Sequence, residues 1–243
     1  MSYRVSSEIP MKTNKKKGKG SLQNATGQKL MEMFVLLLKH FGPQHWWPGD
    51  TSLEMMIGAV LTQNTSWKNV EKVLKNLKDL HELSLEGLHS QSTHELAKKI
   101  RPAGYYNVKA KRLKNLIDFI VDRYGADLTS LLEAETGVLR EGLLSIKGIG
   151  PETADSILLY AAGRPIFVID AYTHRILIRH GMIDEQATYD EIQAFFMDHL
   201  PDDADLFNEF HALIVRTGKV FCRKKPLCPG CPLKNWGNLS PFL

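Results

Sequence analysis

One aspartate in this sequence stands where a carboxylate could do chemistry. Asp170 ends the apolar run 166–169 and directly precedes a predicted helix that includes Tyr172. An aspartate at this place is a favourable helix N-cap, which fixes the carboxylate and keeps it ionised. A fixed carboxylate can also stabilise a developing positive charge or activate a water molecule. The pattern therefore leaves a structural cap and a catalytic group open, and one residue can serve as both.

A glycine turn about twenty residues before that aspartate could bind an anion. Gly148, Ile149 and Gly150 connect two predicted helices, and the residues Pro151 to Thr153 begin the second of them. Proline suits the first helical position, and the free N–H groups of a helix start attract phosphate. The turn thus predicts a contact with DNA phosphates, with Thr153 as its polar side chain. A plain connector between two packed helices has the same pattern.

The three cysteines, Cys222, Cys228 and Cys231, are the only ones in the chain. Three cysteines so close together do not form a disulfide framework. They are typical of a protein in a reducing compartment and of a metal site. A 4Fe-4S cluster normally needs four thiolates. Zinc with three thiolates needs a histidine, and none follows His211. A bound cluster, zinc and no metal all stay open.

The elements that must position these residues are helices. Apolar residues recur at intervals of three and four in 70–77 and 113–120. Further helical patterns cover 29–39, 52–63, 136–144, 152–162, 171–180, 189–199 and 206–219. No Asn-Gly or Asp-Gly hairpin turn occurs, and 166–169 is the only run typical of a strand. The sequence predicts an all-α protein with eight to eleven helices.

Composition and charge limit the class of protein. The chain has 243 residues, 43% hydrophobic and 24% charged, which excludes a disordered or fibrous protein. The longest strongly apolar run, 34–38, is far too short to span a membrane, and the N-terminus lacks the apolar core of a secretory signal. Residues 1–24 contain six lysines or arginines and one glutamate. We expect a disordered basic tail that either attracts phosphates or has no role.

Several motifs together resemble a known family. The pattern Leu-x-x-x-Gly-Ile-Gly-x-x-Thr-Ala at 144–154, followed by the apolar run and Asp170, resembles the helix-hairpin-helix glycosylase superfamily of base-excision repair. Segment 101–110 looks like the Gly-x-Tyr-x-x-Lys-Ala segment of its endonuclease III branch, and 59–65 looks like that branch's helix and wedge loop. The resemblance extends from about residue 26 to 236.

The resemblance implies two helical subdomains with a DNA-binding cleft between them. Residues 45–163 would form a bundle that ends in the helix-hairpin-helix, and 25–44 with 164–220 would form the second subdomain. Residues 221–243 would be a cysteine loop similar to the iron–sulfur loop of endonuclease III. That loop has a fourth cysteine where this chain has Gly237, so the ligand set for a 4Fe-4S cluster is incomplete.

The resemblance also assigns roles. Asp170 would be the catalytic carboxylate. Bifunctional members carry a lysine that attacks the sugar at the position of Glu152, and a carboxylate cannot form that imine. We therefore expect a monofunctional enzyme without lyase activity. Gln63 or Asn64 would be the wedge that fills the place of the flipped nucleotide. Tyr106, Lys109 and Lys111 are the other residues expected near phosphates; for Lys109 and Lys111, a solvated helix face is the alternative.

The tryptophans bear on the substrate. Trp46, Trp47 with Pro48, and Trp67 lie near the expected cleft. Indole rings attract a cationic alkylated purine by about 0.5–2 kcal/mol, although they could simply pack a domain junction. Together with Glu152 they resemble bacterial 3-methyladenine DNA glycosylases of this branch.

We therefore predict hydrolysis of the N-glycosidic bond of alkylated purines such as 3-methyladenine. A glycosylase for mismatched or oxidised bases and a catalytically silent DNA-binding relative are the alternatives. We expect double-stranded DNA with a damaged base as the partner, no membrane, a monomer, and no cofactor for the chemistry. The expected location is the cytoplasm, in association with the nucleoid.

Overall fold

The computed structural model describes residues 25–46 and 49–237, and the regular secondary structure within these ranges is helical throughout. The principal helices are α1 (Ala25–Phe41), α2 (Ser52–Leu61), α3 (Trp67–Asp79), α6 (Tyr106–Tyr124), α8 (Thr136–Ser145), α9 (Pro151–Ser156), α10 (Ala171–Arg179), α11 (Tyr189–Met197) and α12 (Ala204–Val220). The expectation of an all-α protein is confirmed. The apolar run 166–169 lies in an extended segment that pairs with no strand in the described ranges.

The described residues contain twelve α-helices, more than the eight to eleven that the periodicity predicts. The additional ones are short: α4 (Leu85–Ser90), α5 (Thr93–Lys99) and α7 (Leu128–Glu133). Six or seven residues do not complete two turns, so their apolar positions show no period. Each begins at a polar cap, including a full capping box at α5, and these caps are the signal that locates them.

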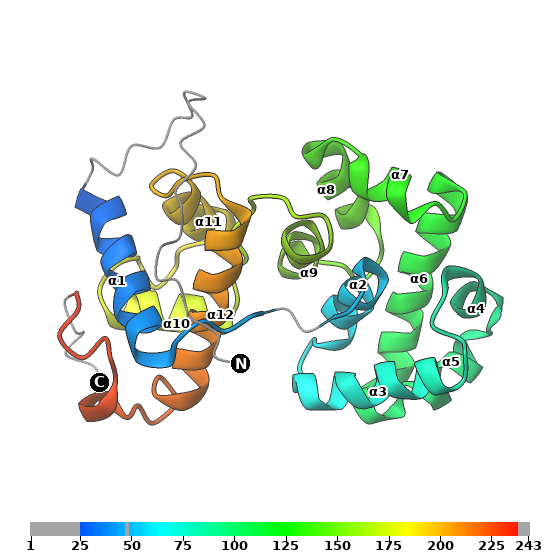
Figure 1. Ribbon diagram of the computed structural model, residues 1–243, viewed down its shortest axis with the longest axis horizontal. Coiled ribbons are helices and arrows are strands. Elements are labelled where there is room, and N and C mark those ends of the chain that lie inside the picture. Colours follow the sequence, from blue (N-terminus) through cyan, green and yellow to red (C-terminus); the bar gives the residue numbers. More distant parts are fainter. Residues whose placement is uncertain (1–24, 47–48, 238–243) are drawn as a thin grey trace, which may run out of the picture.

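Two lobes, each with its own core, make up the molecule (Figure 1). The larger lobe contains α2 to α8, and its core residues lie between positions 56 and 158. The smaller lobe contains α1, α10, α11 and α12, and its core residues lie at 30–37 and 159–236. The cores meet within one continuous helical segment, α9 followed by the π-type turn η2 (Ile157–Ala161), where Leu158 belongs to one core and Leu159 to the other.

Close packing in the smaller lobe determines which side chains meet. Gly218 on α12 lies so close to α10 that a Cβ added there would overlap the Tyr172 ring. The absence of a side chain at this position lets the two helices approach each other. As a result the buried face of α12, which includes His211, lies against the start of α10. No described helix is long and apolar enough to cross a membrane.

Candidate active site

Asp170 caps α10, and its two carboxylate oxygens have different surroundings. Oδ1 accepts hydrogen bonds from the backbone N–H groups of Tyr172 and Thr173, at 2.9 and 2.8 Å, and from the Thr173 hydroxyl at 2.9 Å. Oδ2 has no hydrogen bond from the described residues and lies 3.8 Å from Nε2 of His211. The side chain is only 11% exposed. One oxygen therefore fixes the helix start, while the other remains for chemistry.

A chain of buried polar groups leads from Asp170 into the smaller lobe. His211 contacts the Tyr160 hydroxyl through its Nδ1, and Trp46 interacts with the same tyrosine. Burial lowers the pKa of His211, more than the nearby Asp170 charge raises it. Burial also raises the pKa of Tyr160 well above its ordinary value. Both rings are therefore held neutral beside the carboxylate.

Two further ionisable groups face Asp170. Glu152, the second residue of α9, has its pKa raised to about 7 by partial loss of hydration and by the negative charge of Asp170. Lys219 on α12 has its pKa lowered by desolvation, which Asp170 partly opposes. The Lys219 ammonium lies 5.5 Å from the centre of the Trp46 ring. Two carboxylates and one amine therefore surround the point where the lobes meet.

The hairpin connects α8 to α9 at the inner side of the larger lobe. Ile146 and Ile149 are buried and anchor the turn, while Gly148 has a φ of +98°. A Cβ at Gly148 would overlap the aliphatic part of Arg112, so the turn requires glycine for both backbone and space. The described residues provide no acceptor for the N–H groups of Gly148 and Gly150, whereas the Ile149 N–H bonds to Ile146 within the turn.

The loop after α2 is tied to this hairpin. Gln63 donates from Nε2 to the Thr153 hydroxyl at 2.8 Å, and its Oε1 accepts from Arg112. Asn64 is exposed and has a left-handed backbone with φ +55°. Thr153 is buried, and its N–H bonds to Gly150 within the helix start. The loop therefore presents Asn64 to solvent while Gln63 holds the loop and the hairpin together.

Lys109 does not contact phosphate, contrary to the expectation from its sequence. Its side chain is 2% exposed, and its ammonium donates to the carbonyls of Leu61 and Ala103 at 2.9 and 2.7 Å. Burial lowers its pKa. The lysine satisfies one carbonyl at the end of α2 and one just before α6, and so supports the base of the Gln63 loop. In the sequence, Lys109 precedes Ala110 in an amphipathic helix, and this pattern does not indicate that the lysine ammonium is buried. Lys111 is exposed, and Tyr106 packs partly against the core.

A second carboxylate, Asp155 on α9, joins the two lobes. It is fully buried and accepts from Nε and Nη2 of Arg140 on α8, at 2.7 and 3.1 Å. From α11 the Tyr189 hydroxyl and the Gln193 amide donate to it, each at 2.8 Å. The Gln193 amide also donates to the Phe167 carbonyl, at 2.8 Å. This cluster fixes the segment that leads to Asp170.

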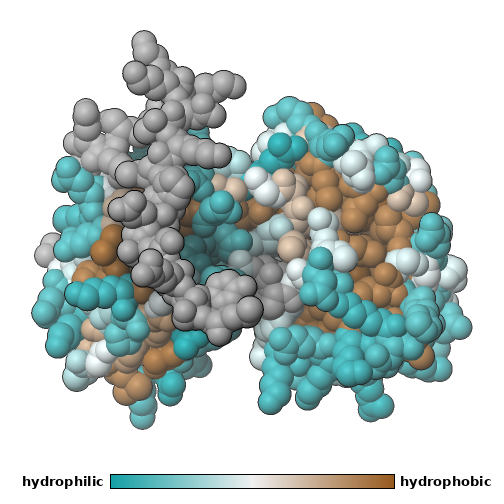
Figure 2. Space-filling model, in the orientation of Figure 1, coloured by the Kyte–Doolittle hydropathy of each residue, from teal (hydrophilic) through white to brown (hydrophobic). Residues whose placement is uncertain are grey.

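The expected pocket tryptophans lie in different surroundings. Trp46 is half-buried against the core of the smaller lobe and joins the polar chain that ends at Asp170. Trp67 begins α3 and packs against the core of the larger lobe. Trp47 and Pro48 lie outside the described residues. The space-filling view shows a recess between the lobes whose visible part is mostly hydrophilic (Figure 2).

The cysteine loop does not offer a complete ligand set. Cys222 and Cys231 are buried and Cys228 is half-buried, and all three line one small cavity. His180 lines it too, but its Nδ1 bonds to the Trp236 carbonyl at 2.7 Å. Among the described residues no group of three or more metal-ligating side chains is arranged to hold a metal ion.

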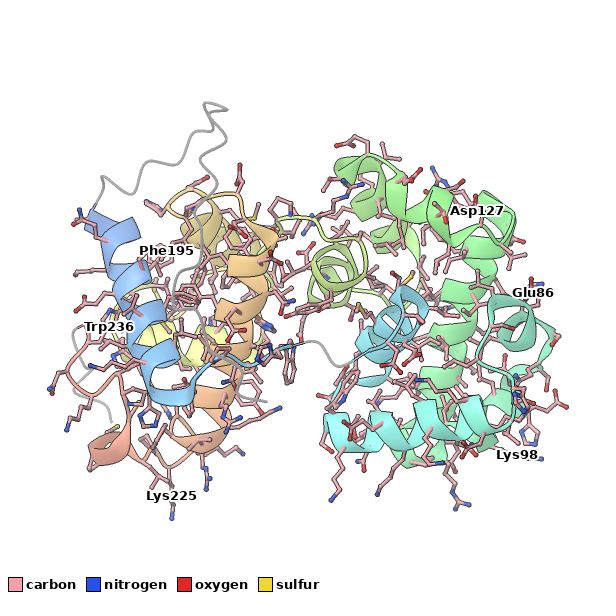
Figure 3. The ribbon with its side chains drawn as sticks, in the orientation of Figure 1. Glu86, Lys98, Asp127, Phe195, Lys225 and Trp236 are labelled. Carbon is pink, nitrogen blue, oxygen red and sulfur yellow. The ribbon has the colours of Figure 1, made fainter. Side chains whose placement is uncertain are left out.

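Gly237 replaces the fourth cysteine for a structural reason. Its φ is +68°, and a Cβ there would lie 3.0 Å from the His180 carbonyl oxygen. Trp236 lies beside α1 (Figure 3) and donates from Nε1 to the Lys29 carbonyl at 3.1 Å. The loop is thus held by glycine geometry and tryptophan packing where a cluster-binding loop would use a thiolate. The described residues therefore do not fit a four-thiolate cluster.

Sequence reasoning missed three residues of the site: Tyr160, His211 and Lys219. Tyr160 and His211 appeared as members of apolar helical patterns, and both are buried. The only signal was a polar group on the apolar face of each helix. Such a group needs a partner when it is buried, but its sequence does not say which one.

Known proteins with similar sequences include DNA repair enzymes. The model of the HhH-GPD superfamily of base excision DNA repair proteins matches residues 57–202. A Methanocaldococcus jannaschii protein named as a DNA repair glycosylase is 49% identical over 86% of this chain and 96% of its own length. Endonuclease III of Thermotoga maritima is 30% identical over 74% of this chain and 80% of its own.

Solved structures show the same fold. The crystal structure of H. pylori 3-methyladenine DNA glycosylase bound to 1,N6-ethenoadenine superposes with a TM-score of 0.69 and 35% identity, over 80% of this chain and 97% of that one. A non-covalent complex of endonuclease III with DNA has a TM-score of 0.74 at 22% identity, over 87% of this chain and 94% of that one.

Proposed function

Since the chain belongs to the HhH-GPD superfamily of base excision DNA repair proteins, we propose that it is a monofunctional DNA N-glycosylase. Its substrate is double-stranded DNA that contains an alkylated purine, 3-methyladenine above all. The observation that carries this proposal is the geometry of Asp170. One oxygen is saturated by three donors, and the other faces the junction of the lobes without a hydrogen bond from the described residues.

The free oxygen of Asp170 suits hydrolysis of a glycosidic bond. Departure of the base leaves positive charge on the sugar, and a fixed carboxylate stabilises that charge more effectively than solvent does. The same oxygen can orient or deprotonate the attacking water. A cationic alkylated purine is already a good leaving group, so no other strong catalyst is needed.

Glu152 supports the monofunctional mode. It occupies the position from which a lysine would attack the sugar, and a carboxylate forms no imine. Lys219 is the described amine that interacts with Asp170, and its ammonium lies over the Trp46 ring. If a covalent intermediate formed, Lys219 would be the amine to examine.

The relatives support the choice of substrate. The 35% identical structure is named as a 3-methyladenine DNA glycosylase and holds a modified adenine. Trp46 supplies an indole ring on the polar chain that leads to Asp170, and Trp47, Pro48 and Trp67 complete the proposed pocket. Against this choice, the Lys219 ammonium at Trp46 repels a cationic base from that face of the ring. The 30% identity to endonuclease III keeps oxidised or mismatched bases as the second candidate.

The hairpin and the loop after α2 supply the DNA contacts of this proposal. The N–H groups of Gly148 and Gly150, which lack an acceptor in the described residues, would bind a phosphate. The buried Thr153 would support the turn through Gln63 rather than touch DNA itself. Asn64, exposed with a left-handed backbone, is the better placed of the two wedge candidates.

The test measures free bases released from methylated double-stranded DNA by the wild type and by Asp170→Asn. Strand nicking is scored before and after alkali, and parallel reactions contain borohydride. We expect 3-methyladenine release that requires Asp170, nicks only after alkali, and no covalent adduct. Release of oxidised or mismatched bases instead would overturn the substrate.

Two other results would overturn the reaction. An adduct trapped by borohydride contradicts the monofunctional mode, and its loss in Lys219→Met would identify the amine. DNA binding without release of any base, unchanged in Asp170→Asn, would indicate a silent DNA-binding relative.

A further inference from the structure

A histidine from the far end of the chain completes the environment of Asp170. His211 lies on α12, 41 residues after Asp170, and its side chain is 7% exposed. Its Nε2 has no hydrogen-bond partner among the described residues, although it is buried. The nearest carboxylate oxygen, Oδ2 of Asp170, is 3.8 Å away. A buried ring nitrogen without a partner is costly, so its direction toward the one oxygen left for chemistry calls for a functional reason.

The surroundings of the two ring nitrogens determine which of them carries the hydrogen of neutral His211. The Tyr160 hydroxyl contacts Nδ1 of His211, and a tyrosine hydroxyl can donate its hydrogen to an unprotonated ring nitrogen. On the other side of the ring, Oδ2 of Asp170 can only accept a hydrogen bond. A neutral imidazole that accepts at Nδ1 carries its proton on Nε2. The arrangement therefore directs an N–H group toward Oδ2 of Asp170.

Three other ionisable groups act on this chain. Glu152 and Asp170 add negative charge near Tyr160, and Lys219 adds positive charge near His211. A positive histidine would attract Asp170 strongly, but it would be buried beside Lys219. The neutral tautomer gives a directed donor without that repulsion.

We propose that His211 is a positioning residue for Asp170. Its Nε2–H, set by the Tyr160 hydroxyl on the other side of the ring, restricts rotation of the carboxylate and holds Oδ2 toward the reacting sugar. When Oδ2 moves by less than 1 Å toward His211, the 3.8 Å separation becomes a hydrogen bond. Because Trp46 interacts with Tyr160, a base stacked on that tryptophan would be coupled to the carboxylate. The inference rests on the proposed function.

The experiment compares His211→Asn with His211→Gln in the full chain. The asparagine amide replaces Nδ1, so it keeps a partner for Tyr160 but cannot reach Asp170. The glutamine amide extends to the place of Nε2 and keeps an N–H donor there. We expect His211→Asn to lower the single-turnover rate of base release by about 10- to 100-fold at an unchanged half-saturating DNA concentration. His211→Gln should recover at least tenfold of that loss.

His180 provides the matched control, because it is also buried and also uses Nδ1, toward the Trp236 carbonyl. His180→Asn should lower Tm without changing the rate per folded molecule. If the asparagine and glutamine variants at position 211 lose activity equally, in step with their Tm, the role is structural and the proposal is wrong.

The tautomer can be measured without any substrate. In protein with ¹⁵N-labelled histidine, NMR should show a protonated Nε2 and an unprotonated Nδ1 for His211. Tyr160→Phe should give a mixture of tautomers, and Asp170→Asn should shift the Nε2 resonance. A proton on Nδ1 would overturn the proposal even if the enzyme is active. If NMR shows the predicted tautomer but the protein releases no base, the proposed function is wrong while the inference about the His211 tautomer stands.

Discussion

Asp155 and Asp170 lie fifteen residues apart, at the two ends of the segment that joins the lobes, and they show how a structural carboxylate differs from a reactive one. Both oxygens of Asp155 are paired, by Arg140, Tyr189 and Gln193. Among the described residues, Asp170 has three donors on one oxygen, whereas the other lies 3.8 Å from His211 and accepts no hydrogen bond. A fully paired carboxylate has no capacity left for a substrate, whereas a half-paired one is both fixed and available.

The two carboxylates also depend on different parts of the chain. The donors to Asp170 Oδ1 come from the next three residues, so the cap forms with its helix. The donors to Asp155 come from α8 and α11, fifteen residues before it and 34 to 38 residues after it. The Asp155 cluster therefore forms only when the lobes dock, and we expect it to determine how firmly they are held.

The largest effect should come from Asp170→Asn. Asparagine is as good an N-cap as aspartate, so Tm should fall by only a few degrees. Loss of the negative charge should lower the single-turnover rate of base release by about 10²- to 10⁴-fold. Thermal unfolding and base release measured on one preparation check this. Equal activity in the variant would mean that Asp170 is only a cap.

Asp155→Ala should show the reverse pattern. Removing the carboxylate leaves the half-buried Arg140 without this partner. Because Arg140 is partly exposed, we expect the free energy of unfolding to fall by about 3 kcal/mol, the lower end for a broken buried ion pair. The rate of base release per folded molecule should change little. Urea unfolding measures the loss, and Asp118→Asn, at a surface ion pair, is the control with an effect below about 1 kcal/mol. A large fall in the rate of base release by folded Asp155→Ala would contradict a purely structural role for Asp155.

Removing one hydroxyl from each cluster gives a smaller contrast. Thr173→Val deletes a donor to Asp170 and should slow base release about tenfold, because hydrogen bonds to a charged group are worth about 1.5–3 kcal/mol. Tyr189→Phe deletes a donor to Asp155 and should cost about 1 kcal/mol of stability, with no change in rate. Rates and urea midpoints of both variants, measured in parallel, decide whether the two clusters are separable.

The smallest effect concerns the pH dependence of stability. The pKa of Glu152 is raised to about 7 in the folded protein, above its ordinary value of 4.5. Between these values the folded state keeps a proton that the unfolded state has lost, so stability falls as pH rises through this window. Glu152→Gln should remove that part of the slope in urea midpoints measured from pH 4.5 to 7.5. An unchanged slope would mean that the pKa of Glu152 is not raised in the folded protein.

The sequence alone determined the local features. Helical periodicity gave the all-α class, glycine and proline marked the hairpin, and Asp170 stood before its helix. These features depend on residues within a few positions of one another, whose geometry the backbone fixes directly. The family resemblance extended this to the candidate catalytic group and to Glu152 in place of a lysine.

Only the tertiary structure decided which groups meet. It buried Lys109 under carbonyls of two segments, attached Gln63 to Thr153 ninety positions away, and placed His211 opposite Asp170. A buried polar side chain must find a partner, but its sequence leaves that partner undetermined among all the helices that could pack against it. The close approach of α12 to α10 at Gly218 makes the choice here, because it brings the histidine within reach of the one carboxylate oxygen that the helix cap leaves free.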